Sequence, residues 1–133
     1  MPRVLVVDDD STLRTTVAEF LEDAGYAVET ARNGADALAK VHADSFAAIV
    51  LDLMMPVMNG WEFLDACGNE LLAEQIPVAV VSAAYAPGSV ASRPGVSVVL
   101  SKPFDLDVLE AIVQQFTAPR ADMDSRARRA DAH

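Results

Sequence analysis

The sequence predicts a doubly wound α/β fold, in which helices cover both faces of a five-stranded parallel sheet. Short apolar runs rich in valine alternate along the chain with longer segments whose apolar residues recur at helical spacing. The runs are apolar at successive positions, which is typical of strands buried on both faces in a parallel sheet. Right-handed crossovers between such strands place helices on both faces. The strands are expected at residues 4–7, 26–31, 46–51, 78–81 and 97–100.

The expected helices follow capping and turn residues. Ser11 can cap a first helix, which Gly25 ends in the left-handed conformation that favours glycine. A second helix follows an Asn-Gly turn, and a third is expected from Trp61, with the Gly-Asn pair at 68–69 interrupting it. Asp105 can cap a last helix whose apolar residues form one stripe.

Two segments lack a clear pattern. Residues 83–96 contain two Pro-Gly pairs, which leave room only for a short or irregular fourth helix. Residues 119–133 have no periodicity and carry mixed charge, so we expect a disordered C-terminal tail there. A chain of 133 residues can form one domain with a sizeable core but not two ordinary ones. We therefore expect a single domain over residues 1–118.

Charge and composition exclude several classes of protein. The net charge is −10, and up to residue 116 six basic side chains stand against seventeen acidic ones. Such a surface repels phosphate, so we expect no nucleic acid partner. Cys67 is the only cysteine, which excludes an intramolecular disulfide and suits a reducing compartment. Because the sequence shows no signal peptide and no apolar run of membrane-spanning length, we expect a cytoplasmic protein without a membrane partner.

The polar residues that follow the predicted strands are the strongest functional signal. Because parallel strands end at the same edge of the sheet, we expect these side chains to gather where open α/β sheets bind their ligands. Carboxylates so close together repel one another unless a cation screens them. Mg²⁺ suits such a site, since it takes one or two carboxylates together with waters and phosphate oxygens. The residues concerned are Asp8, Asp9, Asp10, Asp52, Ser82 and Lys102.

This set of groups could carry out phosphoryl transfer. Asp52 is the candidate nucleophile and phosphoacceptor. Asp9 is the first candidate Mg²⁺ ligand, together with Asp52 itself. Asp8 would act on the metal through a water, and Met54 through its backbone carbonyl. The groups that hold the phosphoryl oxygens would be Ser82 and Lys102.

Four motifs lie at the ends of the predicted strands. They occupy residues 4–10, 52–60, 80–83 and 102–104, and they read VLVVDDD, DLMMPVMNG, VVSA and KPF. Together they resemble the receiver domain of two-component response regulators, over residues 3 to about 117. The resemblance implies a flavodoxin-like sheet with strand order 2-1-3-4-5, Mg²⁺ as cofactor, and a phosphoryl group passed to Asp52 from the phosphohistidine of a histidine kinase. It also implies a cis peptide bond between Lys102 and Pro103.

Three features depart from the family pattern. Met54 and Ala84 stand two residues beyond Asp52 and Ser82, where the family tunes how water reaches the phosphoryl group. Neither side chain can hold a water in line, so we expect slow self-dephosphorylation. The family places an aromatic residue three positions before the lysine, as part of a switch that follows phosphorylation, and Val99 stands there. Tyr85 is either a replacement for that aromatic residue or an exposed loop tyrosine. Many family members dimerise through the face of the fourth helix, and the irregular segment 83–96 leads us to expect a monomer or a weak homodimer.

The resemblance implies a signalling switch with no output domain in this chain. Its partners would be a histidine kinase or a phosphotransfer protein, and a downstream protein that reads the changed surface. It would catalyse only its own phosphorylation and a slow dephosphorylation. Two alternatives remain open. An aspartyl-phosphate phosphatase would need a second acid where Met54 stands, and a pseudo-receiver would bind its partner without phosphorylation and keep the acidic residues as a vestige.

Overall fold

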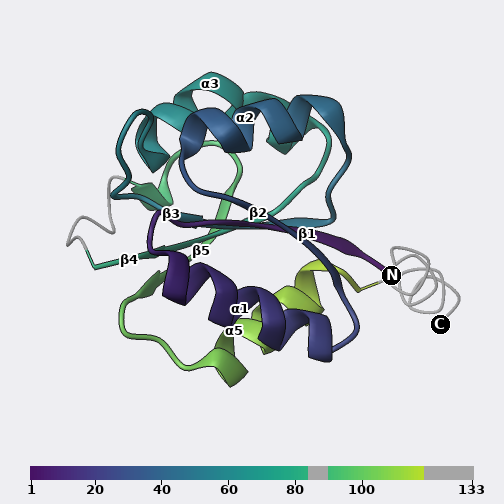
Figure 1. The fold of residues 1–133 in the computed structure, drawn as a ribbon. Helices are drawn as coiled ribbons and strands as arrows, with labels where there is room; N and C mark the ends of the chain where they lie inside the picture. The colour runs from purple at the N-terminus through teal and green to yellow at the C-terminus, as the bar shows by residue number, and fades with distance from the viewer. Residues whose placement is uncertain (84–89, 119–133) are drawn as a thin grey trace, which may run out of the picture.

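The computed structural model describes residues 1–83 and 90–118, and within them the chain forms a five-stranded sheet with helices on both faces (Figure 1). All neighbouring strands are parallel, in the order β2-β1-β3-β4-β5, as predicted. None of the helices in this part of the chain is long and apolar enough to cross a membrane. The strands are β1 (Arg3–Val7), β2 (Ala27–Ala31), β3 (Ala48–Asp52), β4 (Val78–Ser82) and β5 (Val96–Ser101). The helices are α1 (Ser11–Asp23), α2 (Gly34–Ala43), α3 (Gly60–Ala73) and α5 (Leu106–Phe116).

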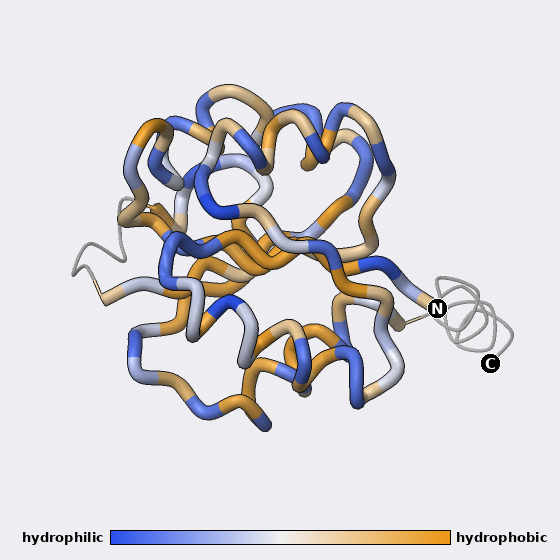
Figure 2. Tube along the Cα trace, in the orientation of Figure 1, coloured by the Kyte–Doolittle hydropathy of each residue, from blue (hydrophilic) through white to orange (hydrophobic). Residues whose placement is uncertain are grey.

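Two hydrophobic cores lie on opposite faces of the sheet. Along β1, Leu5 and Val7 face the core under α2 and α3, whereas Val4 and Val6 face the core over α1 and α5. This alternation makes the central strands apolar on both faces, as their hydropathy shows (Figure 2). Cys67 is buried in the core under α2 and α3, and burial raises the pKa of its thiol to about 12, so it packs as an apolar side chain.

The ends of α1 confirm one prediction and correct another. Gly25 follows the helix with a φ of 104°, the left-handed conformation expected of it. The N-cap, however, is Asp10 and not Ser11. One carboxylate oxygen of Asp10 accepts from the backbone N–H groups of Thr12 at 3.0 Å and Leu13 at 3.2 Å. A carboxylate here meets the positive end of the helix dipole, and Ser11 becomes the first helical residue.

The prediction that α3 breaks at residues 68–69 is wrong, because the helix runs unbroken from Gly60 to Ala73. Gly68 serves packing instead. A Cβ atom on Gly68 would lie 2.7 Å from the carbonyl oxygen of Pro94, in the segment before β5. Next to Pro94, Arg93 forms an ion pair with Asp65 on the same helix. The glycine therefore lets this segment lie directly on α3.

The short or irregular fourth helix is expected within residues 83–96, and of these the structure describes residue 83 and residues 90–96, with residues 90 and 91 helical. Residues 84–89, among them Tyr85, and the expected disordered tail at residues 119–133 lie outside the described residues. The expected domain of residues 1–118 covers all five strands and the four helices named above.

The contact at Gly68 predicts that Gly68→Ala destabilises the protein. Alanine in a helix is favoured over glycine by about 1 kcal/mol, but the added methyl group must displace a backbone carbonyl. We expect a net loss of about 1–2 kcal/mol in the free energy of unfolding, measured by urea denaturation. Asn69→Ala, on the exposed side of the same helix, is the control and should be neutral or slightly stabilising. A Gly68→Ala variant as stable as this control would contradict the packing role.

Candidate functional site

The carboxyl ends of β1, β3, β4 and β5 meet at one edge of the sheet and bring the predicted residues together. Asp8 follows β1, and its backbone N–H donates to the carbonyl of Ala31 at the end of β2, at 3.0 Å. Asp52 ends β3 and Ser82 ends β4. The backbone N–H of Lys102, which follows β5, donates to the carbonyl of Ser82 at 3.0 Å. Strand pairing thus sets the positions of these four residues.

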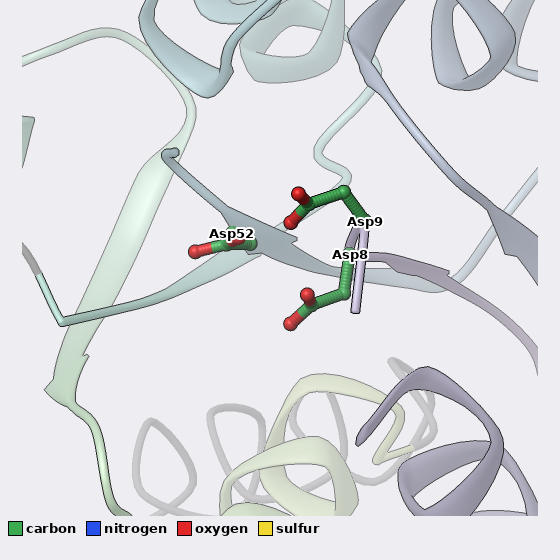
Figure 3. Close-up of side chains that lie close together, drawn as sticks. All are labelled: Asp8, Asp9 and Asp52. Carbon is green, nitrogen blue, oxygen red and sulfur yellow. The ribbon is translucent and has the colours of Figure 1, made fainter. Parts of the chain in front are cut away.

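Three carboxylates gather at this edge, from Asp8, Asp9 and Asp52 (Figure 3). One oxygen of each lies within 4.8 Å of the others. Asp8 and Asp52 are each 3% exposed, whereas Asp9 is exposed. The Nζ atom of Lys102 lies 3.0 Å from Oδ2 of Asp8 and 3.4 Å from Oδ1 of Asp52. One ammonium group therefore bridges the two buried carboxylates.

The electrostatics of the site follow from burial and from this bridge. Burial, and then the negative charge of Asp8, raise the pKa of Asp52 from 3.8 to about 6, against the opposing effects of Lys102 and the backbone N–H of Met54. Burial lowers the pKa of Lys102, but its contacts with Asp8 and Asp52 outweigh burial and leave that pKa raised. At neutral pH Asp52 is therefore largely ionised and Lys102 is charged.

The donor set fits a hard divalent cation. Three carboxylates offer oxygen ligands at close range, and like charges so arranged favour an ion of charge +2. In the described part of the chain, the side chain of Asp9 accepts no hydrogen bond, so its carboxylate is available as a ligand. Mg²⁺, which keeps several waters, suits this partly open site. The assignment of the Met54 carbonyl as a further ligand stays a prediction.

The loop after Asp52 is tightly built. A Cβ atom on Gly60 would lie 2.7 Å from the carbonyl oxygen of Asp52, so only glycine fits where α3 begins. Within the loop, the N–H of Met58 donates to the carbonyl of Pro56 at 2.8 Å, which closes a γ-turn around Val57. Val57 has a φ of 70°, a strained conformation for a β-branched residue. Close packing at Gly60 and the γ-turn at Val57 therefore restrict the backbone that follows Asp52, the candidate phosphoacceptor.

The family pattern makes predictions about two positions near Lys102 in the sequence, Pro103 and Val99. The Lys102–Pro103 peptide bond is cis, as the resemblance implied. Val99 lies within β5, partly buried against the core under α2 and α3.

Two contacts of the site do not follow from the sequence pattern. Asp10, one of the acidic residues expected at this edge, donates its backbone N–H to Oδ1 of Asp8 at 3.0 Å. Arg14, on α1, donates from Nη1 to the backbone carbonyl of Asp8 at 2.8 Å. The available signal was a basic residue one turn into a helix that follows three acids, but sequence alone does not show which acceptor it reaches.

A model of the response regulator receiver domain matches residues 4–114. The chain therefore belongs to the response regulator receiver domain family. It is 35% identical over 116 residues to the transcriptional regulatory protein CrdR of Helicobacter pylori, an alignment that covers 86% of this chain and 54% of CrdR. The chain thus spans about half the length of the curated relatives that it matches first.

Solved receiver structures share the fold. The chemotaxis response regulator CheY4 of Vibrio cholerae matches with a TM-score of 0.78 and 36% identity, covering 87% of this chain and 98% of CheY4. The response regulator TrrA of Thermotoga maritima, solved in complex with Mg(2+)-BeF, matches with a TM-score of 0.77 and 28% identity, covering 87% of this chain and 99% of TrrA.

The raised pKa of Asp52 predicts that Asp52→Asn stabilises the protein. The folded pKa, about 6, lies above the unfolded value of 3.8, so the native state binds the proton more tightly. As pH rises through this interval the wild type loses stability relative to the variant, and above about pH 6 the difference is constant. We expect the variant to be more stable by about 1–2 kcal/mol at pH 7, measured by urea denaturation with a chelator present.

The difference should shrink below about pH 4 and on adding Mg²⁺, which would bind the wild type better. Asp23→Asn, an exposed acid at the end of α1, controls for the loss of one negative charge. Equal stabilisation by the two variants would contradict a free-energy cost that is specific to the buried carboxylate of Asp52.

Proposed function

We propose that this chain is a phosphorylation-controlled switch, in which Asp52 accepts a phosphoryl group from the phosphohistidine of a histidine kinase or a phosphotransfer protein. The observation that carries the proposal is the cluster of Asp8, Asp9 and Asp52 with Lys102 bridging two of its carboxylates. Membership of the receiver family supports it. The same family membership supports a signalling role in place of turnover of other substrates.

The geometry supports an in-line transfer. An oxygen of Asp52 would attack the phosphorus as the phosphorus–nitrogen bond of phosphohistidine breaks, and the bonding electron pair would return to the imidazole, which then takes a proton. Lys102, 3.4 Å from Asp52, would bind a phosphoryl oxygen, and the Ser82 hydroxyl would bind another. Mg²⁺, when held by Asp9 and Asp52 and through a water by Asp8, would neutralise charge on the phosphoryl oxygens.

An apolar groove beside Lys102 supports a protein as the phosphodonor. It runs from α1 to the segment between β5 and α5, and its lining includes Lys102, which contacts Asp8 and Asp52. A helix that carries a phosphohistidine could lay apolar side chains in this groove and bring its phosphoryl group to Asp52. The groove is lined by Leu13, Thr16, Ala83, Lys102, Pro103, Phe104 and Leu106.

The output of the switch is a changed surface. A phosphoryl group on Asp52 would draw Ser82 and Lys102 towards it, and the backbone bond between these two residues would move the ends of β4 and β5 together. A downstream protein would read this change. We further propose a cytoplasmic protein, monomeric or weakly dimeric, in which this acidic chain itself binds neither nucleic acid nor membrane.

One observation favours a second candidate. Val99 occupies the position at which the family places a switch aromatic, so this chain could act as a pseudo-receiver that binds its partner without phosphorylation. The phosphatase alternative is disfavoured, because the exposed thioether of Met54 can neither donate nor accept a proton for catalysis.

Intact-mass spectrometry after incubation with acetyl phosphate and Mg²⁺ tests the proposal. We expect the wild type to gain the mass of one phosphoryl group, and Asp52→Asn to gain none, because the amide is not a nucleophile. Chelating the metal should abolish the gain. An adduct that persists in Asp52→Asn would refute the assignment of Asp52, and no adduct on the wild type would favour the pseudo-receiver.

Met54 predicts a long-lived phosphorylated state. Its exposed side chain lies two residues after Asp52 and cannot hold an attacking water in line, whereas an amide can. Met54→Asn should shorten the half-life of the phosphorylated protein about fivefold, since one hydrogen bond to the attacking water lowers the barrier to hydrolysis by about 1 kcal/mol. Phosphate release over time measures it, and Val57→Asn, in the same loop, is the control. Half-lives that are equally short in wild type and Met54→Asn would contradict the prediction.

A further inference from the structure

We propose that Arg14 is a positioning residue for the Mg²⁺ site, because it holds the peptide group between Asp8 and Asp9 and so presents the carboxylate of Asp9 to the metal. The inference rests on the proposed function, since it concerns the metal site described there. It assigns to α1 a part in forming the site besides covering the sheet.

The contact falls on the peptide that joins two candidate ligands. Arg14 donates from Nη1 to the carbonyl oxygen of Asp8 at 2.8 Å. That carbonyl belongs to the peptide group between Asp8 and Asp9, and a peptide group is planar. Holding its oxygen therefore restricts the orientation of the Asp9 backbone, and with it the direction in which the Asp9 side chain leaves the chain.

The backbone of Arg14 is itself held in place by helix α1. It lies in the first turn of α1, where its backbone N–H donates to the carbonyl of Asp10 at 2.9 Å. Asp10 caps that helix and also donates its own N–H to Oδ1 of Asp8 at 3.0 Å. The half-buried guanidinium thus reaches back from a rigid helix to the loop that precedes it.

Asp9 depends on this constraint more than Asp8 does. The carboxylate of Asp8 is already held by the N–H of Asp10 and by Lys102. Asp9 is exposed, and its side chain makes no hydrogen bond or ion pair with residues 1–83 or 90–118. Its position before a metal binds is therefore set by its backbone, which Arg14 restrains.

The charge of Arg14 and its positioning role predict opposite changes in Mg²⁺ affinity when Arg14 is removed. The direction of the measured change therefore decides between them. A guanidinium beside a cation site repels the cation, and by charge alone the removal of Arg14 would raise the affinity for Mg²⁺. If Arg14 positions Asp9, its removal lowers that affinity instead. Residues that orient metal ligands typically change metal affinity by about 10–100-fold when mutated.

The test is isothermal titration of Mg²⁺ into the unphosphorylated full chain. We expect Arg14→Met to lower the Mg²⁺ affinity about tenfold, and Arg14→Lys, which keeps a nitrogen donor of nearly the same reach, to restore most of it. Arg32→Met is the matched control. Arg32 is exposed just after β2, and within the described chain its side chain makes no hydrogen bond or ion pair, so the control removes the same charge from this edge of the sheet without touching the 8–9 peptide. Its affinity should be unchanged or slightly raised.

The outcomes separate this inference from the proposed function. Mg²⁺ affinity that is unchanged or raised in Arg14→Met, with the wild type binding normally, overturns the role of Arg14 and leaves the proposed function standing. A wild type that binds no Mg²⁺ overturns the metal site itself and this inference with it. Urea denaturation checks that each variant is folded, and if Arg14→Met is not, Arg14→Gln replaces it with the same expected loss, because its amide is too short to reach the carbonyl.

Discussion

The ammonium group of Lys102 is the interaction on which the site depends. It lies between the carboxylates of Asp8 and Asp52, both almost fully buried at the end of the sheet. Two buried negative charges at this distance would destabilise the fold without a cation between them. Because Asp8, Asp52 and Lys102 follow three different strands, this charge compensation also requires β1, β3 and β5 to end at the same level. Electrostatics and sheet register thus support each other.

The site nevertheless holds unfavourable features that the rest of the fold has to offset. Burial raises the pKa of Asp52 to about 6, so at neutral pH the ionised side chain is held at a cost in free energy. Val57, three residues before α3 in the loop that follows Asp52, adds a strained backbone. The helices that cover the sheet above and below (Figure 1) enclose the two packed cores whose burial has to offset these costs. Functional sites commonly concentrate such local costs.

The sequence predicted what depends on local pattern and on the geometry of parallel sheets. Valine-rich runs predicted the strands, and their shared carboxyl edge predicted the meeting of Asp52, Ser82 and Lys102. What it missed depends on contacts between distant residues. The local pattern predicts a helix break at Gly68, because the carbonyl of Pro94 that this glycine accommodates lies in another segment of the chain. Arg14 could not be assigned, since its acceptor is a backbone atom, which any residue would provide.

The residues that would carry out phosphoryl transfer and the residues that would select a partner belong to different parts of the fold. Asp52 lies in register with Val81 of β4, and Ser82 with Ser101 of β5, so backbone pairing deep in the sheet sets the spacing of these groups. The outward faces of the helices have no part in that spacing. If the groove beside α1 and α5 binds the phosphodonor as proposed, surface residues of these helices other than Arg14 can be exchanged to redirect the chain to a different partner while the acceptor site stays intact. For the same reason, the sheet edge is a suitable scaffold for designed signalling pairs that must not cross-react.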